Sequence, residues 1–305
     1  MDKVTISVPA TTANLGVGFD CLGAALSMAN EFQFAVVDTS TKLKIVVSGE
    51  EAQKVGTGEG NLVYYSFLKL YQRIAKTPPN IKIAINLGVP LSRGLGSSAT
   101  AIVGGLMGAN SLAGNPLTET EIMHMAIAIE GHPDNVVPAL LGSCLLSVED
   151  EDKWQISSIP WHQDIVPVVA IPNFELSTNK ARSVLPTEYS RSDAIFNISR
   201  MGLLIRGLDT NNGEWLKTAL ADKLHQPYRQ QLIPGYLEVR QAAINTGAYG
   251  VVISGAGPTL LALTNPQNVA GVVASMTQTW KNMGIDAVVR SLTLDRLGAK
   301  ILDRD

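Results

Sequence analysis

The residues of this 305-residue chain best suited to chemistry lie in a glycine- and serine-rich loop, residues 88–100, which reads GVPLSRGLGSSAT. Gly94 and Gly96 leave no side chain between backbone and ligand and tolerate a positive φ. Ser97 and Ser98 place hydroxyl groups where they can cap a helix, bind phosphate oxygens or contact a metal ion. The pattern favours binding of an anion, most simply a polyphosphate, and the alternative is an ordinary helix start with capping serines.

The elements flanking this loop are predicted from their periodicity. Residues 81–87 alternate apolar and polar side chains, as a strand does, and an apolar helix is expected from residue 97 onward. Thr118 and Glu121 have the spacing of a capping box that opens a second helix. Further along, residues 166–171 are predicted as a buried strand, and residues 194–208, 214–224 and 236–245 as helices.

Two familiar phosphate-binding loops are excluded. The chain contains no GxxxxGK[ST] sequence, so it has no Walker A loop. Residues 94–99 fit the dinucleotide fingerprint GxGxxA, but Pro90 separates them from the preceding strand, and helix follows helix where a second strand is required.

Polar side chains cluster again at residues 130–136, which read EGHPDNV. Gly131 and Pro133 stop helices, so Glu130 and Asp134 are expected at a helix end and the following turn. One carboxylate there can hold Mg²⁺, and another can orient or deprotonate a hydroxyl group. The alternative is a capped helix junction without chemistry.

Two further loops complete the candidate set. Asn14 and Asp20 lie in an apolar neighbourhood within residues 9–20 and need polar partners, in the protein or in a ligand, although a hairpin turn is the alternative. Residues 254–259, SGAGPT, read as a strand–loop–strand. Single arginines such as Arg182 and Arg229 usually lie on the surface and matter here only if a carboxylate or phosphate ligand is nearby.

Composition limits the class of protein. The chain is 46% hydrophobic and 17% charged, with a net charge of −3 and no basic blocks, so we expect no nucleic-acid partner. No apolar run reaches membrane-spanning length, no signal peptide is recognised, and Cys21 and Cys144 are too few for a disulfide framework. A cytoplasmic protein is expected.

Together these motifs resemble those of the GHMP small-molecule kinases. Residues 9–20 (PATTANLGVGFD), 90–99 (PLSRGLGSSA) and 254–259 (SGAGPT) are similar to the three superfamily motifs, in the same order. Residues 130–136, 177–182 (STNKAR) and 227–235 (PYRQQLIPG) resemble the homoserine kinase family in particular. Val17 and Ala256 stand where the family often has proline and serine.

The resemblance implies an α+β fold with two lobes, residues 1–155 like ribosomal S5 domain 2 and residues 156–305 ferredoxin-like. It implies ATP-dependent phosphorylation of the side-chain hydroxyl of L-homoserine in threonine biosynthesis, with Mg²⁺ held by Ser98 and Glu130, and it makes a homodimer an expectation. The implied nucleotide site consists of Asn61, Pro90, Leu91, Ser92, Arg93, Gly94, Leu95, Gly96, Ser97, Ser98, Ala99 and Thr100. The implied homoserine site consists of Asn14, Asp20, His132, Asp134, Asn135, Thr178, Arg182, Arg229 and Gly255.

Homoserine is a zwitterion with a hydroxyl group, and the residue types agree with it. Arg182 and Arg229 suit its carboxylate, and Asp20 suits its ammonium group. Related kinases of the superfamily use an aspartate with a lysine as base, but no such lysine lies beside the first motif. We therefore expect catalysis by alignment and electrostatics, with Asp134 or Asn135 orienting the hydroxyl group. Two alternatives are a GHMP kinase for mevalonate, a phosphorylated isoprenoid or a sugar, and a ligand-sensing protein that has lost transfer.

Overall fold

The computed structural model describes residues 2–38, 40–151 and 153–304 of the chain. The first half of the chain, joined by the C-terminal strand β11, forms a seven-stranded sheet with the order β11-β1-β2-β4-β3, in which β5 pairs with β2 and β6. The strands are β1 (Lys3–Asn14), β2 (Gly18–Val36), β3 (Leu43–Ser48), β4 (Ile81–Asn86), β5 (Cys144–Asp150), β6 (Lys153–Ile159) and β11 (Lys300–Arg304). Only the β3–β4 pair is parallel among the strand pairs of the described residues.

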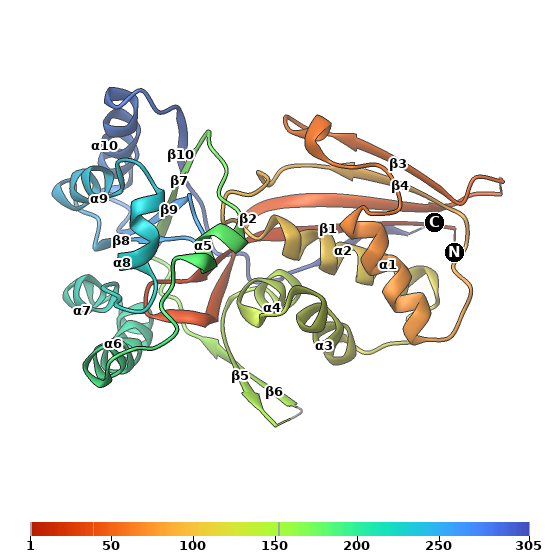
Figure 1. Ribbon diagram of the computed structural model, residues 1–305, viewed down its shortest axis with the longest axis horizontal. Coiled ribbons are helices and arrows are strands. Elements are labelled where there is room, and N and C mark those ends of the chain that lie inside the picture. Colours follow the sequence, from red (N-terminus) through yellow and green to blue (C-terminus); the bar gives the residue numbers. More distant parts are fainter. Residues whose placement is uncertain (1, 39, 152, 305) are drawn as a thin grey trace.

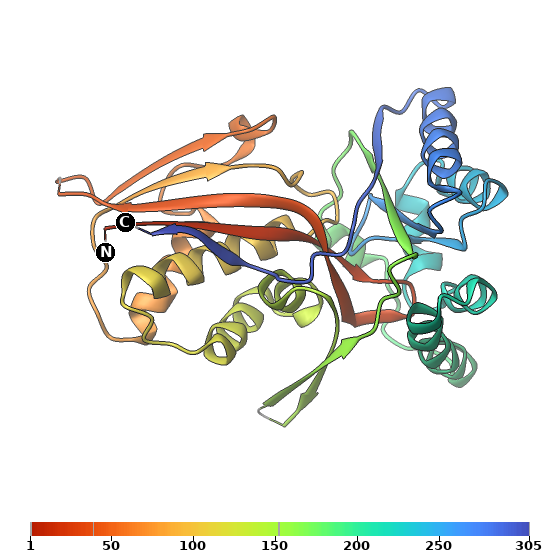
Figure 2. The same cartoon turned by 180° about the vertical axis from the view of Figure 1, so that it is seen from behind.

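Four helices cover one face of this sheet, as Figures 1 and 2 show. They are α1 (Leu62–Arg73), α2 (Ser97–Leu112), α3 (Glu119–Glu130) and α4 (Pro133–Leu141). Phe32 and Phe34 of β2 pack against α2 at Gly104 and Gly108, where a Cβ atom would lie less than 2.5 Å from the rings. The glycines therefore let α2 approach the sheet closely, which places its first residue at the sheet's end.

The second half is a four-stranded antiparallel sheet, β10-β7-β9-β8, covered on both faces. Its strands are β7 (Val166–Pro172), β8 (Gly250–Ile253), β9 (Leu260–Thr264) and β10 (Ala287–Ser291). Val168 and Ala170 face α9 and α10, whereas Val169 and Ile171 face α6 and α7. The predicted buried strand at 166–171 is thus confirmed, and its continuous apolar run reflects burial on both faces.

The helices of this half surround its sheet in Figure 1. They are α5 (Thr178–Ser183), α6 (Arg191–Thr210), α7 (Gly213–Ala219), α8 (Gln226–Arg229), α9 (Tyr236–Asn245) and α10 (Val269–Asn282). A short 3₁₀ turn, η2 (Gln230–Leu232), follows α8, and another, η1 (Ala52–Lys54), lies in the first half of the chain. The predicted helix over 214–224 was wrong at its end, because α7 stops at Ala219. The Asp222 carboxylate instead accepts backbone N–H bonds from Leu224, His225 and Gln226, which starts α8.

The β1–β2 hairpin connects the two halves. Its tip, red in Figure 1, leaves the first sheet, and Leu15, Val17 and Leu22 pack with residues of α6, α7 and the second sheet. The boundary predicted after residue 155 falls inside β6, and the division of the chain at that position stays a prediction. No helix in the described ranges is both long and apolar enough to cross a bilayer.

Candidate active site

The loop before α2 has the conformation that its glycines predict. Gly94 and Gly96 have φ of +76° and +68°. A Cβ atom at Gly94 would lie 2.3 Å from the Ser254 carbonyl oxygen, and one at Gly96 would lie 2.0 Å from the Thr11 hydroxyl. Gly96 is the N-cap of α2 and offers no side-chain acceptor, so the first N–H groups of the helix are not capped by a side chain of the described residues. This start is open to an anion.

The loop is held by both of the other superfamily motifs. The Thr11 backbone N–H donates to the Leu95 carbonyl at 3.1 Å, and the Ser254 hydroxyl donates to the Gly94 carbonyl at 2.6 Å. Three segments far apart in sequence therefore converge at one point, and the two outer motifs fix the shape of the central one.

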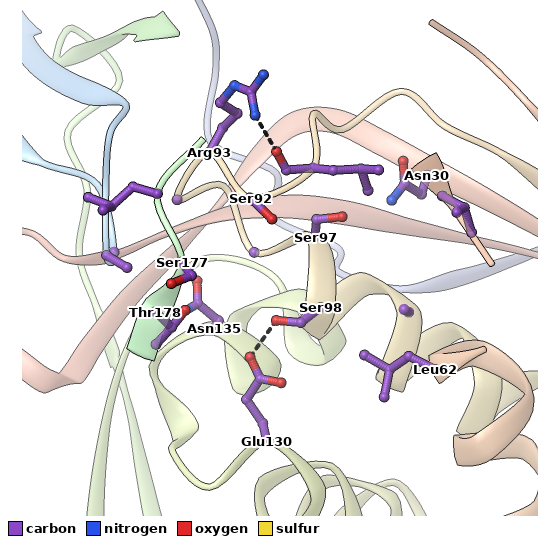
Figure 3. A pocket seen from close by; sticks show the side chains of 18 of the residues that line it. Asn30, Leu62, Ser92, Arg93, Ser97, Ser98, Glu130, Asn135, Ser177 and Thr178 are labelled. Carbon is purple, nitrogen blue, oxygen red and sulfur yellow. Dashed lines mark hydrogen bonds between the residues drawn. The ribbon is translucent and has the colours of Figure 1, made fainter. Parts of the chain in front are cut away.

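An oxygen pair lies beside the start of α2. The Ser98 hydroxyl donates to the Glu130 carboxylate at 2.6 Å, with Glu130 at the end of α3, which Gly131 terminates in the left-handed conformation (Figure 3). Mg²⁺ is usually bound by one or two protein oxygens, waters and substrate phosphates. Two hard oxygen ligands next to an anion-binding helix start fit that requirement.

The turn after α3 joins His132, Asp134 and Asn135. The His132 Nδ1 lies 2.7 Å from the Asp134 carboxylate, which also accepts a 3.3 Å hydrogen bond from the Asn135 amide. The Thr11 hydroxyl donates to Asn135 Oδ1 at 2.8 Å. Burial opposes the imidazolium, but the hydrogen bond and negative charge of Asp134, with Glu130, raise the pKa of His132. The buried Asp134 carboxylate is thus engaged by two neighbours.

Asp20 and Arg182 form a bidentate ion pair at 2.8 and 2.9 Å. Asp20 is held in the left-handed region, φ +58°, by its backbone N–H, which donates to Asn14 Oδ1. The Asn14 amide in turn donates to the Gly255 carbonyl at 2.9 Å. Partial burial disfavours the guanidinium charge, but the two hydrogen bonds that Arg182 donates to Asp20, together with the negative charge of Asp20, raise the pKa of Arg182. The polar residues of the hairpin turn thus have partners in the protein.

Arg229 differs from Arg182 in its surroundings. Its side chain is only 2% exposed and donates to the carbonyls of Ala181 (3.2 Å) and Gly255 (3.0 Å). No carboxylate of the described residues forms an ion pair with it. Burial lowers the pKa of Arg229, although the nearby Asp20 charge opposes this.

One cavity of about 490 Å³ contains most of the predicted residues. Its wall includes Asn14, Asp20, Asn61, Leu91, Ser92, Arg93, Gly94, Gly96, Ser97, Ser98, Glu130, His132, Asp134, Asn135, Thr178, Arg182, Arg229 and Gly255. Four predicted nucleotide-site residues, Pro90, Leu95, Ala99 and Thr100, do not line it. Leu95, Ala99 and Thr100 are buried, and they support the loop from behind.

Arg93 and Asn61 line the cavity but also have structural partners. Arg93 donates to the carbonyls of Leu91, Pro172 and Asn173, so its guanidinium ties the loop to the second half of the chain. Asn61 is the N-cap of α1 and accepts backbone hydrogen bonds with its side-chain oxygen. Both positions therefore stabilise the walls of the cavity.

Sequence reasoning missed part of the wall. Asn30, Lys54 and Ser177 line the cavity, as do apolar residues including Leu62, Val63 and Leu176. Asn30 is a polar residue in an apolar stretch of β2, the same signal that identified Asn14, so it was detectable. Lys54 lies in a polar loop whose composition gives no such signal.

Comparison with known proteins agrees with the motifs. Residues 61–143 match the family described as GHMP kinases N terminal domain, and residues 204–282 match GHMP kinases C terminal. A homoserine kinase of Trichodesmium erythraeum is 60% identical over 299 residues, covering 98% of both chains, and one of Trichormus variabilis is 62% identical over the same length. This chain belongs to the homoserine kinase family. The family lies within the GHMP kinase superfamily.

Solved structures agree with this membership. The crystal structure of homoserine kinase from Cytophaga hutchinsonii superimposes with a TM-score of 0.90 at 29% identity, covering 99% of this chain and 98% of that one. The L. major mevalonate kinase in complex with R-mevalonate has a TM-score of 0.73 at 15% identity, which shows the shared fold alone. The α+β fold predicted for the homoserine kinase family is therefore confirmed.

Proposed function

We propose that this chain transfers the γ-phosphoryl group of ATP to the side-chain hydroxyl of L-homoserine, giving O-phospho-L-homoserine. Relatives named homoserine kinase match the chain over almost its whole length at about 60% identity. The observation that carries the proposal is that one cavity joins an open, glycine-lined helix start to a wall that holds the Asp20 carboxylate and the guanidinium groups of Arg182 and Arg229. A polyphosphate fits the first part and an amino acid fits the second.

The nucleotide would place its phosphates at the start of α2. The N–H groups around Gly96 and the positive end of the helix bind anions without a side-chain competitor. Ser98 and Glu130 would hold Mg²⁺ there, and the bound ion would neutralise charge on the β- and γ-phosphates. Asn61 and the apolar residues at the start of α1 would line the adenine end of the cavity.

Homoserine would bind at the other end, where Asp20, Arg182 and Arg229 line the same cavity. Its ammonium group pairs with the Asp20 carboxylate, and its carboxylate is bound by Arg182 and Arg229. Asn14, His132, Thr178 and Gly255 would complete this part of the wall. Asp20 and Arg182 already form an ion pair. A zwitterion brings an ammonium group to Asp20 and a carboxylate to Arg182 and Arg229, so each of these charges has a partner of opposite sign in the complex.

The transfer itself would depend on alignment. In a loose transition state the bond between the attacking hydroxyl oxygen and phosphorus is only slightly formed. The hydroxyl group therefore does not need a strong base to remove its proton. The Asp134 carboxylate already accepts two hydrogen bonds, which suits it to orient a hydroxyl. Asn135 is held by Thr11, which also lies against Gly96 of the phosphate loop, so the acceptor hydroxyl and the phosphates share one support.

A coupled ADP-release assay tests the proposal, with homoserine, mevalonate and galactose as acceptors. We expect homoserine to have the highest kcat/KM, by at least about 10²-fold. A clear preference for another acceptor would overturn the substrate assignment. In the same assay, unchanged turnover in both Asp134→Asn and Asn135→Ala would remove these two residues from the mechanism.

Because the proposed reaction consumes ATP, we propose that it takes place in the cytoplasm. The homodimer predicted from the resemblance stays a prediction.

A further inference from the structure

Arg229 is fixed by an unusual set of partners for a buried cation. A guanidinium group has five N–H donors. Nε donates to Ala181, and Nη1 donates to the Gly255 carbonyl and lies 3.4 Å from His225 Nδ1. Nη2 donates to no residue that the structure describes, and the side chain lines the cavity. The protein thus restrains one side of the guanidinium and leaves the other for a ligand.

The hydrogen bonds of His225 define its tautomer. The ring is completely buried, and Nε2 lies 2.8 Å from the Gly16 carbonyl oxygen. A carbonyl can only accept, so Nε2 carries the proton, and Nδ1 of the neutral ring is then an acceptor for Arg229. Burial lowers the pKa of His225, with the Arg229 charge acting in the same direction and Asp222 opposing. A neutral ring therefore agrees with the geometry.

Phe19 packs on the His225 ring, and Asp222 holds the backbone of the same residue. The plane of the imidazole stacks on Phe19 with 5.2 Å between centroids, and the Arg229 guanidinium lies 5.1 Å from the same phenyl ring. The Asp222 carboxylate binds the His225 backbone N–H and accepts from the Asn197 amide at 2.7 Å. His225 therefore joins the β1–β2 hairpin, whose second strand carries Asp20, to the helix that carries Arg229.

We infer that His225 is a positioning residue that holds the Arg229 guanidinium for the substrate carboxylate and so makes the enzyme selective for an amino acid over an amine that lacks the carboxylate. The inference rests on the proposed function and deepens it. Without the His225 acceptor, the guanidinium keeps, among the described residues, only its hydrogen bonds to the Ala181 and Gly255 carbonyls and is held less firmly. Bidentate recognition of a carboxylate depends on a fixed donor geometry.

Two substitutions separate the hydrogen bonds of His225. In His225→Gln the amide nitrogen takes the place of Nε2 and can donate to Gly16, but the acceptor facing Arg229 is lost. In His225→Asn the amide oxygen takes the place of Nδ1 and keeps that acceptor. The acceptors to compare are homoserine and 3-aminopropan-1-ol, which is homoserine without its carboxylate.

We expect His225→Gln to raise KM for homoserine about tenfold or more, with kcat within about twofold. Its kcat/KM for 3-aminopropan-1-ol and its KM for ATP should stay within about twofold of wild type, and His225→Asn should keep most of the discrimination. Equal losses with both acceptors, or a larger loss in Asn than in Gln, would show a merely structural role and overturn the inference.

A second measurement uses the wild-type protein and does not depend on how the variants fold. Nitrogen-15 NMR of labelled histidine should show His225 as the neutral Nε2–H tautomer at neutral pH, and the Nδ1–H or imidazolium form would overturn the inference. The proposed function fails separately, if wild type does not phosphorylate homoserine at all. In that case the inference fails with it, whatever the tautomer.

Discussion

The two ends of the cavity are built in different ways. The phosphate-binding part of the nucleotide end comes from one short stretch, residues 91–98 without Leu95, in which Gly94 and Gly96 have positive φ and which Thr11 and Ser254 hold from outside. The homoserine end takes its charged groups from three distant parts of the chain, with Asp20 in the first hairpin, Arg182 in α5 and Arg229 in α8. The phosphate loop is therefore a contiguous motif, whereas the charged groups of the homoserine end meet only when the two halves of the chain are assembled.

This difference matches the chemistry of the two ligands. A polyphosphate carries the same charges whatever the acceptor, so backbone N–H groups suffice to bind it. An amino acid must be distinguished from other alcohols, and that requires side chains of both signs in a fixed arrangement. We expect acceptor specificity to reside in the assembled end alone.

The largest expected effect tests the assembled end. Asp20→Ala should lower kcat/KM for homoserine by about 10³-fold, because the ammonium group would be left without its counter-charge beside two arginines. With 4-hydroxybutanoate, which is homoserine without its ammonium group, the same substitution should change kcat/KM by no more than about threefold. Steady-state ADP release with the two acceptors measures both values.

Asp209→Ala is a matched control for this experiment, since Asp209 pairs with Arg206 on α6 outside the cavity wall. It should leave both acceptors unaffected. Parallel losses with homoserine and 4-hydroxybutanoate in Asp20→Ala would mean that Asp20 supports the fold and does not recognise the ammonium group.

The same contrast explains what could be predicted from sequence. The loop at 88–100, the Thr118–Glu121 capping box and the α9 span 236–245 follow local rules, and the structure confirms each of them. The end of α7 did not follow such rules, because Asp222 caps the next helix with its side chain.

The role of individual site residues was harder to predict. Residue types alone made Asp20 and Arg182 candidates, but their bidentate pairing joins positions 162 residues apart. His225 gave no signal at all, because its importance lies in a carbonyl at Gly16 and a guanidinium one helical turn away. Contacts of this kind depend on the packing of α8 against the hairpin, which periodicity does not encode.

The next effect tests the local end. Glu130→Gln keeps an acceptor for the Ser98 hydroxyl but removes the charge, so we expect kcat to fall about 10²-fold and the Mg²⁺ concentration for half-maximal rate to rise about tenfold. A magnesium titration at saturating ATP measures the shift. Glu119→Gln, an exposed position on the same helix, is the control, and an unshifted midpoint in Glu130→Gln would exclude Glu130 as a metal ligand.

The smallest expected effect tests whether the phosphate loop needs support from strand β2. Asn30, buried in β2, accepts the N–H groups of Gly88 and Val89 at 2.9 Å and donates to Thr100 on α2, so it joins both ends of the loop. Asn30→Ala leaves two N–H groups without their acceptor, and we expect the free energy of unfolding to fall by about 2 kcal/mol in urea titrations, with a higher KM for ATP.

The exposed Asn86→Ala on β4 controls for loss of an asparagine from the same sheet, since among the described residues its side chain only accepts a 3.3 Å bond from Ser48. If Asn30→Ala loses stability but keeps the wild-type KM for ATP, the loop keeps its shape without β2, and the nucleotide end is a self-contained motif. If KM rises as expected, both ends of the cavity need distant residues, and they differ in whether those residues touch the ligand or only support the loop that does.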